Sequence, residues 1–375
     1  MNGERCDVLI VGGGPAGSSC ARALTQAGLD VMIMDKSAFP RDKVCAGWVT
    51  PPVLETLQID AAEYAQYGTL QPITSFRVGF IAGEARTADY PQVVSYGIRR
   101  CEFDHYLVQR AGARQLLNET LRSLTRVDNH WRVNDHIEAK LLIGAGGHFC
   151  PVARYLGADV GSREVAVKAR EIEFPLSAAQ QRRCAVAAHR PELYFCPDLK
   201  GYGWIFRKGD YLNIGLGRED SQRLSEHSAA FMSWLKATGR IPDDVPEAFK
   251  GHAYLLYSHG QRKLFDDGVL LIGDAAGLAY PQSGEGIRPA VESGLLAAAT
   301  IIAADGDYSA ANLATYPRRL STRFGAPRPD FSQHLPVPVR QFVATRLLST
   351  AWFARHVVLD RWFLHSQQAP LRAIA

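Results

Sequence analysis

Three glycines near the start of the chain have the spacing of a phosphate-binding turn. Gly12, Gly14 and Gly17 form a GxGxxG pattern. In this pattern the first glycine allows a tight turn, the second lets the backbone approach a pyrophosphate, and the third lets a helix pack closely against a strand. Asp35 follows 23 residues after Gly12, where a carboxylate can hydrogen-bond ribose hydroxyls. The predicted chemistry is dinucleotide binding.

The flanking residues predict the elements that would hold this turn. The apolar segment 7–11 is typical of a buried parallel strand, and the segment 18–26 predicts a helix that ends before Gly28. A second apolar run, 31–34, ends at Asp35. The amino terminus of the helix offers free N–H groups and positive dipole to phosphates. This complete strand–turn–helix–strand–acid context favours a dinucleotide site over an ordinary glycine-rich turn.

A later segment repeats the pattern of a strand that ends in small residues. The segment 268–277 predicts a buried strand that ends at Asp274, and a loop with Gly284 and Gly286 leads into a helix over 287–303. The simpler interpretation is a strand, a loop and a helix with a capping aspartate. That interpretation leaves the glycines without a purpose.

A third segment, 98–107, predicts the start of an amphipathic helix. Phe103, Leu107 and Val108 would face inward, and Arg100 stands at the beginning of the helix. The simpler interpretation is a surface arginine beside a core helix.

The order and spacing of these segments resemble a known superfamily. The GxGxxG turn, the RxxFD sequence that starts at Arg100 and the GDAAG…PxxGxG sequence that starts at Gly273 are arranged as in the flavoprotein monooxygenases and reductases of the p-hydroxybenzoate hydroxylase fold. The resemblance covers about residues 5–325. It implies FAD, rather than NAD, as the cofactor of the amino-terminal site.

The resemblance also implies which residues would contact FAD. Segment 12–17 would hold the pyrophosphate, and Asp35 would take the adenosine ribose. Arg100 would contact the ribityl–phosphate region, and Asp274 the ribityl and pyrophosphate side. Segment 284–287 would pass close to the isoalloxazine, where a helix amino terminus stabilises negative charge on a reduced ring. The complete predicted set is Gly12, Gly14, Pro15, Ala16, Gly17, Asp35, Lys36, Cys45, Ala46, Arg100, Asp274, Gly284, Gly286 and Ile287.

One segment departs from the superfamily pattern. Members usually carry a GADG-type sequence in the middle of the chain, and this chain has Gly146 where the aspartate is expected, within the segment 144–148. Arg154 downstream is retained. The family aspartate is linked to FAD and NAD(P)H handling, so its absence puts direct nicotinamide use in doubt. The candidates for the external electron donor are NAD(P)H and a separate reductase or carrier protein.

The segment 201–217 predicts a β-hairpin with its turn at 208–210, which places Trp204 and Phe206 on one face. These aromatic side chains either pack in a core or form the wall of an apolar cavity. The string resembles the YxWxFPK…NVGxG element of the geranylgeranyl reductase subfamily, with Arg207 in place of the proline and Ile214 in place of the valine. The resemblance associates this element with the isoprenoid substrate, so Tyr202, Trp204 and Phe206 would line it. The complete predicted substrate-lining set is Tyr202, Trp204, Phe206, Tyr280 and Pro281.

Cys45 lies in the segment 41–51, which follows the second predicted strand. Geranylgeranyl reductases also have a cysteine followed by glycine-rich sequence at this point. Cys45 is either a small buried hydrophobic residue or a thiol near the flavin that shapes the reacting region or protonates the reacting carbon. The predicted catalytic residues are Cys45, Tyr202 and Trp204.

The composition limits the other possibilities. Hydrophobic residues make up 47% of the 375 residues and the net charge is +4, values that exclude a long disordered chain and argue against nucleic-acid binding. The seven cysteines form no CxxC and the histidines form no HExxH, so we expect no metal site and a reducing compartment. With no long uncharged apolar run, we expect a cytoplasmic protein.

The carboxyl-terminal residues predict a helical tail over 339–365. At 100° per residue, Arg340, Arg346, Arg355 and Arg361 occupy one half of its surface. The tail is either an interfacial helix at the inner face of the membrane or, the interpretation we favour, a helix that covers the FAD domain.

The expected fold class is α/β. A discontinuous, Rossmann-like FAD-binding domain (1–68, 95–160 and 262–330) would be interrupted by a mixed β-sheet substrate domain (69–94 and 161–261) and followed by a helical tail (331–375). We expect an FAD-dependent oxidoreductase that saturates C=C bonds of a prenyl or other lipophilic substrate. The alternatives are a monooxygenase that hydroxylates or epoxidises an aromatic or lipophilic substrate, and a non-catalytic electron-transfer partner.

Overall fold

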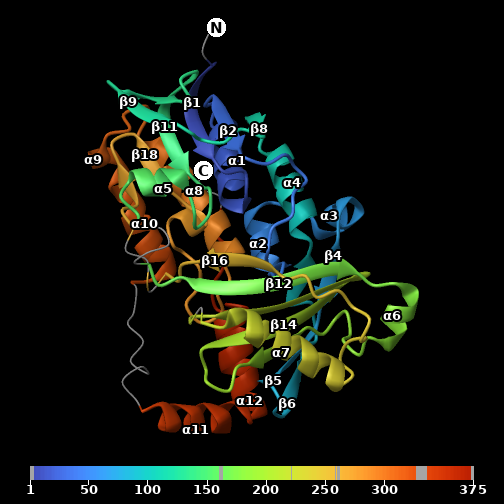
Figure 1. Cartoon of the computed structure of the whole chain (residues 1–375). Helices are drawn as coiled ribbons and strands as arrows, with labels where there is room; N and C mark the ends of the chain where they lie inside the picture. The colour runs from blue at the N-terminus through green and yellow to red at the C-terminus, as the bar shows by residue number, and fades with distance from the viewer. Residues whose placement is uncertain are drawn as a thin grey trace.

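The computed structural model describes residues 4–159, 164–220, 222–257, 259, 262–326 and 336–372. The chain forms two stacked parts (Figure 1), an α/β part that contains the amino terminus and a part built on a broad mixed sheet. Each part is built from stretches of the chain that lie far apart in the sequence. The expected α/β class and the interrupted FAD-binding part are confirmed. The exact domain boundaries stay predictions.

The first part is built on a mainly parallel sheet, which we call the parallel sheet. Its strand order is β17-β18-β11-β1-β2-β8, with β10 and β9 continuing from β11 on a side branch. The strands are β1 (Glu4–Val11), β2 (Val31–Asp35), β8 (Arg114–Leu117), β9 (Leu124–Val127), β10 (His130–Val133), β11 (Ile137–Gly144), β17 (Phe265–Asp266) and β18 (Val269–Leu271). The runs of apolar residues in β1, β2, β11 and β18 are buried because helices and loops cover both faces of a parallel sheet.

Helices pack around this sheet and fix the positions of its loops. Helix α1 (Pro15–Gln26) packs closely against α8 (Ile287–Ala303), where a Cβ at Gly294 would collide with the backbone of Ala16. Helix α4 (Arg100–Arg110) buries Phe103, Leu107 and Val108, as its pattern predicts. The remaining helices of this part are α5 (Pro151–Tyr155), η1 (Gly273–Ala275), α9 (Ala310–Leu313) and α10 (Thr315–Phe324).

The second part is built on the mixed sheet, whose strand order is β16-β12-β15-β14-β13-β5-β6. Its strands are β5 (Ser75–Phe80), β6 (Ala85–Asp89), β12 (Val167–Pro175), β13 (Glu192–Phe195), β14 (Gly201–Lys208), β15 (Tyr211–Arg218) and β16 (Lys250–Tyr254). Strands β14 and β15 form the predicted hairpin, with Lys208 opposite Tyr211. Helix α6 (Ala178–Arg183) lies between β12 and β13 in the chain.

The two faces of the mixed sheet have different coverings. One face buries Ile205, Ile214 and Leu216 in a core with Phe231 and Leu235 of helix α7 (Leu224–Ala237). The other face carries a second apolar cluster that contains Trp204 and Phe206. Alternation of side chains along β14 produces this separation, since neighbouring residues of a strand point to opposite faces.

A small third sheet joins the two parts. It pairs β3 (Trp48–Val49) with β7 (Ser95–Ile98) and β7 with β4 (Leu70–Ile73). Helices α2 (Pro51–Thr56) and α3 (Ala61–Tyr67) lie between β3 and β4 in the chain. Strand β3 follows the loop with Cys45, so this sheet holds that loop against the mixed sheet.

The carboxyl-terminal tail differs from the single helix expected over 339–365. It consists of α11 (Val337–Leu348), the short α12 (Ala351–Phe353) and the π-helix η3 (Ala354–Phe363). The break falls at Thr350, whose side chain accepts a hydrogen bond from the N–H of Phe353 and starts a new helix. The arrangement of four arginines on one continuous helix is therefore wrong, and the Arg340 side chain lies outside the described residues.

The tail also packs against a different part than the favoured interpretation states. Val358, Leu359 and Phe363 join the apolar cluster on the mixed sheet, and Tyr90 donates a hydrogen bond to Asp360 (2.7 Å). Only the last described residues return to the α/β part, where Arg288 donates to the carbonyl oxygen of Gln368 (2.7 Å). Among the described residues, no helix is both long and apolar enough to cross a bilayer.

Candidate functional site

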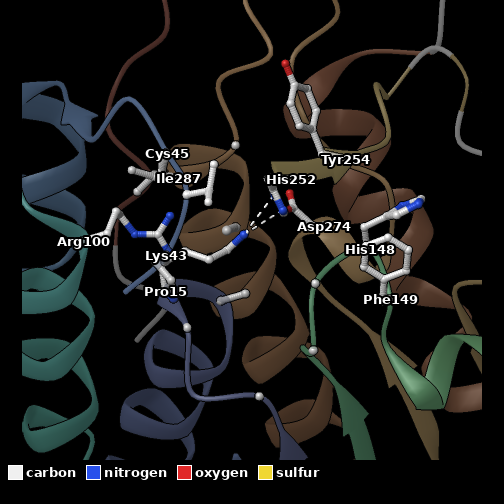
Figure 2. A pocket seen from close by; sticks show the side chains of 18 of the residues that line it. Pro15, Lys43, Cys45, Arg100, His148, Phe149, His252, Tyr254, Asp274 and Ile287 are labelled. Atoms are coloured by element: carbon white, nitrogen blue, oxygen red, sulfur yellow. Dashed lines mark hydrogen bonds and ion pairs between the residues drawn. The ribbon is translucent and has the colours of Figure 1, made fainter. Parts of the chain in front are cut away.

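One large cavity of about 710 Å³ lies between the parallel sheet and the mixed sheet. It extends from Gly12 and Asp35, at the carboxyl ends of β1 and β2, to Trp204 on the mixed sheet and Phe363 of the tail. Figure 2 shows its middle region, where residues from the α/β part and the mixed sheet approach one another. A volume of this size lies within the range of sites that bind cofactors and other small molecules.

The GxGxxG turn forms the phosphate end of the cavity. Gly12 has a φ of +117°, and a Cβ at Gly17 would overlap the carbonyl oxygen of Gly12, so both positions require glycine. Helix α1 begins at Pro15 without a side-chain cap, which leaves its first N–H groups available to an anion. Gly12, Gly14, Pro15 and Ala16 line the cavity, while Gly17 supports the turn from beneath.

Asp35 is held rigidly at the end of β2. Its carboxylate accepts hydrogen bonds from the backbone N–H groups of Gly13 (2.8 Å) and Ser37 (2.9 Å). Arg41 lies between Asp35 and Asp104, with N–O distances of 3.8 and 3.4 Å. The Asp35 carboxylate, beside the phosphate turn, is placed to accept hydrogen bonds from ribose hydroxyls.

Three basic side chains meet an aspartate in the middle of the cavity (Figure 2). Lys43 Nζ lies 3.0 Å from His252 Nε2, which in turn lies 3.7 Å from Asp274 Oδ2. Arg100 is fixed by a double hydrogen bond to Asp104 (2.7 and 2.8 Å). Burial, together with the nearby Arg100 charge, lowers the pKa of Lys43 to about 8. Such crowded, desolvated cations favour an anionic ligand.

The loop before α8 approaches the same region from the opposite side. Gly284 has a φ of +66°, and a Cβ there would collide with the Tyr254 hydroxyl. The N-cap of α8 is Gly286, which has no side chain, and the Glu285 carboxylate accepts a hydrogen bond from the N–H of Arg288 in the first turn (2.7 Å). The helix amino terminus faces the cavity beside Ile287 with this N–H group already bonded. The Tyr202 hydroxyl donates to the carbonyl oxygen of Ser283 and ties this loop to the mixed sheet.

Aromatic side chains form the far wall of the cavity. Trp48 stacks on Phe206 with ring centroids 5.3 Å apart, and Phe363 meets Trp48 edge-on at 5.6 Å. The Trp204 indole N–H donates to Asn213 (2.8 Å), which leaves the apolar face of the ring to line the cavity. Both interpretations of the hairpin aromatics therefore hold, because these residues belong to an apolar cluster and also form a cavity wall.

Cys45 lies where the cofactor end of the cavity meets the aromatic wall. Its backbone carbonyl accepts a hydrogen bond from Asn213 (3.3 Å), and its sulfur accepts from the N–H of Gly47 (3.4 Å). Asn213 also donates to Glu173 (3.2 Å), which pairs with the buried Lys208 (2.7 Å). This network fixes the Cys45 loop on the mixed sheet.

Most of the predicted site residues share this cavity. Cys45, Arg100, Asp274 and Ile287, described above, line it, and so do Lys36 and Ala46. Two predicted substrate residues do not line it. Tyr280 is buried in a stack against His365 with its hydroxyl donating to Gln368 (2.7 Å), and Pro281 borders a separate small pocket. The predicted placement of Tyr280 and Pro281 on the cavity wall is therefore wrong, because the chain at these positions is directed toward the tail and the small pocket.

Several cavity residues carry no sequence signal that would identify them. Lys43, His252 and Glu171 are single polar residues in a loop and two strands. Pairing of β12 with β16 brings Glu171 and His252 to the same side of the cavity, and the loop before β3 brings Lys43 to His252. Phe363 reaches the cavity from the tail, more than a hundred residues after the mixed sheet. Arg41 and Lys43 flank Asp42 in the segment that contains Cys45, and their positions beside the phosphate-binding residues become apparent only in the folded protein.

The Gly146 segment runs beside the phosphate turn. A Cβ at Gly12 would meet the backbone of Ala145 and Gly146, and a Cβ at Gly146 would lie 3.3 Å from the Cys150 Sγ. Gly146 and Arg154 both line the cavity. The segment therefore occupies the position that the resemblance implies, without the carboxylate.

The residues fit a bound FAD. The glycine cradle and the α1 amino terminus suit the pyrophosphate, Asp35 suits the ribose, and the second helix amino terminus at Gly286 suits a ring that becomes anionic on reduction. The cavity continues past these groups to the aromatic wall. Fold and site together define an FAD-dependent oxidoreductase of the p-hydroxybenzoate hydroxylase fold.

Comparisons with known proteins identify the family. The model of the family described as "FAD binding domain" matches residues 5–323, so the chain belongs to this family, in its geranylgeranyl reductase-like branch. The chain is 29% identical over 332 residues to a digeranylgeranylglycerophospholipid reductase of Methanocaldococcus jannaschii, covering 84% of this chain and 81% of the relative. It is 31% identical over 350 residues to a menaquinone reductase of Mycobacterium tuberculosis (86% and 81%).

A solved structure has the same fold. It is that of a geranylgeranyl bacteriochlorophyll reductase-like protein from Thermoplasma acidophilum, with a TM-score of 0.73 and 21% identity. The match covers 99% of this chain and 94% of that one. The tail is thus included in the shared architecture.

Proposed function

We propose that the protein saturates C=C bonds of a prenyl or similarly lipophilic substrate. The observation that carries the proposal is the continuity of one cavity, in which the FAD-binding residues lead directly to an apolar wall of Trp48, Trp204 and Phe206. A substrate lying on that wall would contact the region between Cys45 and the α8 amino terminus. Bound FAD would supply hydride in its reduced form.

The side chains of the wall would bind, orient and exclude water. Stacked aromatic rings offer large, rigid apolar area to a chain of isoprene units. Tyr202, whose hydroxyl is tied to the Ser283 carbonyl, would hold the glycine loop at a fixed distance from this wall. Cys45 would shape the reacting region at the junction. No wall residue needs to change its charge for these roles.

The relatives support a lipid substrate. The two curated names contain a digeranylgeranyl glycerophospholipid and menaquinone, and both are lipids that carry prenyl chains. The apolar wall suits such a chain better than a small polar aromatic acid, because its own polar atoms are already bonded: the Trp204 N–H donates to the buried Asn213, and the Tyr202 hydroxyl donates to the Ser283 carbonyl.

Anaerobic reoxidation tests this proposal. The protein carrying FAD would be reduced photochemically without oxygen and mixed with a geranylgeranyl phospholipid, with menaquinone, or with an aromatic acid of the kind that hydroxylases use. Return of the oxidised flavin spectrum with a prenyl lipid is expected. Reoxidation that occurs only after O₂ is admitted, and that the substrate accelerates, would favour the monooxygenase; the same slow reoxidation with and without every substrate would favour an electron-transfer partner.

A further inference from the structure

Helix α11 turns its apolar side away from the protein. Leu348 is 7% exposed and joins the apolar cluster of the mixed sheet, and Gln341 on the same side donates to the carbonyl oxygen of Pro197 (3.2 Å). On the opposite side lie four exposed apolar residues, to which Trp352 of α12 is added. We call this set the outer stripe; its exposed fractions run from 40% to 66%, and its members are Val339, Phe342, Val343, Leu347 and Trp352.

The spacing of the outer stripe is that of a helix face that normally packs in a core. Residues 339, 342, 343 and 347 recur at i, i+3, i+4 and i+8, which places them within one arc of the helix. A folded protein rarely leaves a continuous apolar face to water without a partner. Figure 1 shows α11 at the extreme end of the molecule, beyond the mixed sheet and far from the amino terminus.

The charged side chains of the segment that carries the stripe are of one sign. From 337 to 359 the chain contains no Asp or Glu, while Arg346 lies within the arc of the stripe. The Arg346 guanidinium lies 5.5 Å from the centre of the Phe342 ring. An apolar face that carries a cation suits a partner that is apolar inside and anionic at its surface, which is the chemistry of a bilayer with acidic lipids.

The opposite side of α11 belongs to the apolar cluster that forms the cavity wall. Helix α11 leads through α12 into η3, whose Phe363 lines the cavity. The same apolar cluster contains Leu348, Phe363 and Trp204. Contact at the stripe would therefore bring a lipid surface to the segment that forms part of the substrate cavity.

We propose that the outer stripe docks on the surface of an anionic lipid bilayer. Phe342, Leu347 and Trp352 enter the boundary between headgroups and acyl chains, and Arg346 contacts the acidic headgroups. The docking does not depend on which reaction the cavity carries out.

Flotation with lipid vesicles tests the docking. The complete protein with FAD bound would be mixed with phosphatidylcholine vesicles that contain or lack phosphatidylglycerol. Wild-type protein is expected to float with the acidic vesicles and less well at high salt. The double variant Phe342→Ser/Leu347→Ser is expected to lose about tenfold or more of its partitioning, since two exposed apolar side chains no longer insert. The matched control is Ile302→Ser, which removes an exposed apolar side chain from α8.

Each outcome decides the docking proposal. Retained FAD absorbance would show that the variants fold, and Arg346→Glu is expected to remove the salt-sensitive part of binding. Wild-type protein that does not float, or equal flotation of wild type and the double variant, would overturn the proposal. A dimer in light scattering that the double variant converts to monomer, without vesicle binding, would assign the stripe to a second copy of the chain.

A second observation concerns Glu171, which lies on β12 opposite Gly215 and lines the cavity. Glu171 is 6% exposed, and its Oε2 atom has no hydrogen-bond partner within the part of the chain that the structure describes. Burial, with help from the neighbouring Glu173 charge, raises the pKa of Glu171 to about 8, although Lys208 opposes the shift. A buried carboxyl that faces a cavity and keeps one oxygen without a hydrogen-bond partner is more readily protonated than ionised.

We propose that Glu171 is the proton donor of the reduction. This proposal rests on the proposed function. A C=C bond that gains hydride at one carbon needs a proton at the other, and the Glu171 carboxyl supplies it as a new C–H bond forms. The carboxylate that remains takes a proton from water, so charge and hydrogen balance over the cycle.

Two variants and two readouts test the role of Glu171. The variant Glu171→Gln is expected to lose about a hundredfold or more in kcat/KM, whereas Glu171→Asp is expected to retain part of the wild-type value. In wild-type protein kcat/KM should decline above pH 8, and this decline should be absent in Glu171→Gln. The second readout is the unfolding free energy against pH. A raised pKa in the folded state means that stability falls as the pH rises from 4.5 to about 8, and Glu171→Gln is expected to flatten this fall, unlike the surface control Glu84→Gln.

The outcomes separate Glu171 from the proposed function. If wild-type protein reduces no C=C bond, the proposed function fails, whatever the stability profile shows. If wild-type protein reduces the substrate and Glu171→Gln keeps both its rate and its pH profile, Glu171 is not the donor. An unchanged stability profile in Glu171→Gln would show that the carboxyl is ionised throughout and would likewise overturn the role.

Discussion

The Trp48 indole stacks on the Phe206 ring, with centroids 5.3 Å apart and planes 6° from parallel. Trp48 follows the Cys45 loop and Phe206 belongs to the mixed sheet, so this contact joins the cofactor half of the cavity to the substrate half. The two rings are part of one apolar wall.

Truncation of this wall should weaken substrate binding more than FAD binding. Phe206→Ala is expected to cost about 3–5 kcal/mol of stability and to raise KM for a prenyl lipid while FAD stays bound. Steady-state kinetics and flavin absorbance measure the two effects. The matched control is Phe231→Ala, equally buried on the opposite face of the same sheet, which should lose similar stability and leave KM unchanged. Equal effects on KM would remove Phe206 from the substrate wall.

The phosphate turn should tolerate no side chain at its third glycine. In Gly17→Ala the added Cβ would overlap the Gly12 carbonyl oxygen, so α1 would move away from the pyrophosphate. We expect FAD affinity to fall by about tenfold or more, measured by titration of apoprotein with FAD fluorescence. Gly28→Ala is the control, because nothing lies within 4 Å of a Cβ there. Normal FAD affinity in Gly17→Ala would contradict the placement of the pyrophosphate.

FAD affinity should fall as the pH rises past 8. The pKa of Lys43 is lowered to about 8 by burial and by Arg100, and a bound pyrophosphate would favour its charged form. The complex then holds more protons than the apoprotein, so affinity decreases with increasing pH. In Lys43→Met this dependence should disappear. An affinity that is independent of pH from 7 to 9 in wild-type protein would place the phosphates away from Lys43.

The sequence predicts much of this site but not all of it. The glycines at 12, 14 and 17 could be identified because local backbone geometry dictates their type and spacing, and Asp274 could be identified because its segment resembles a family motif. Residues such as His252 and Glu171 could not, because strand pairing between distant segments brings them to the cavity. The position predicted for the tail is wrong for a related reason. The residues 339–365 do have a helical pattern, but Thr350 interrupts the helix, and Phe363 packs in the apolar cluster of the mixed sheet.

Substitution of Cys45 distinguishes the two candidate proton donors. The Cys45 sulfur accepts a hydrogen bond from Gly47, whereas the Oε2 atom of the buried Glu171 carboxyl has no hydrogen-bond partner among the described residues. We therefore expect Cys45→Ser to keep turnover within about threefold, whereas general-acid loss costs about a hundredfold or more. Rapid-reaction measurement of flavin reoxidation compares the two variants. A larger loss in Cys45→Ser than in Glu171→Gln would return the role to the thiol.

Analysis of the product tests the central claim most directly. Reduced protein would be given a geranylgeranyl phospholipid in an atmosphere of heavy-oxygen-labelled O₂, and the lipid would be analysed by mass spectrometry. A reductase predicts a product that gains two hydrogen atoms for each saturated C=C bond and no labelled oxygen. A product that contains one labelled oxygen atom would contradict the account and assign the protein to the monooxygenases.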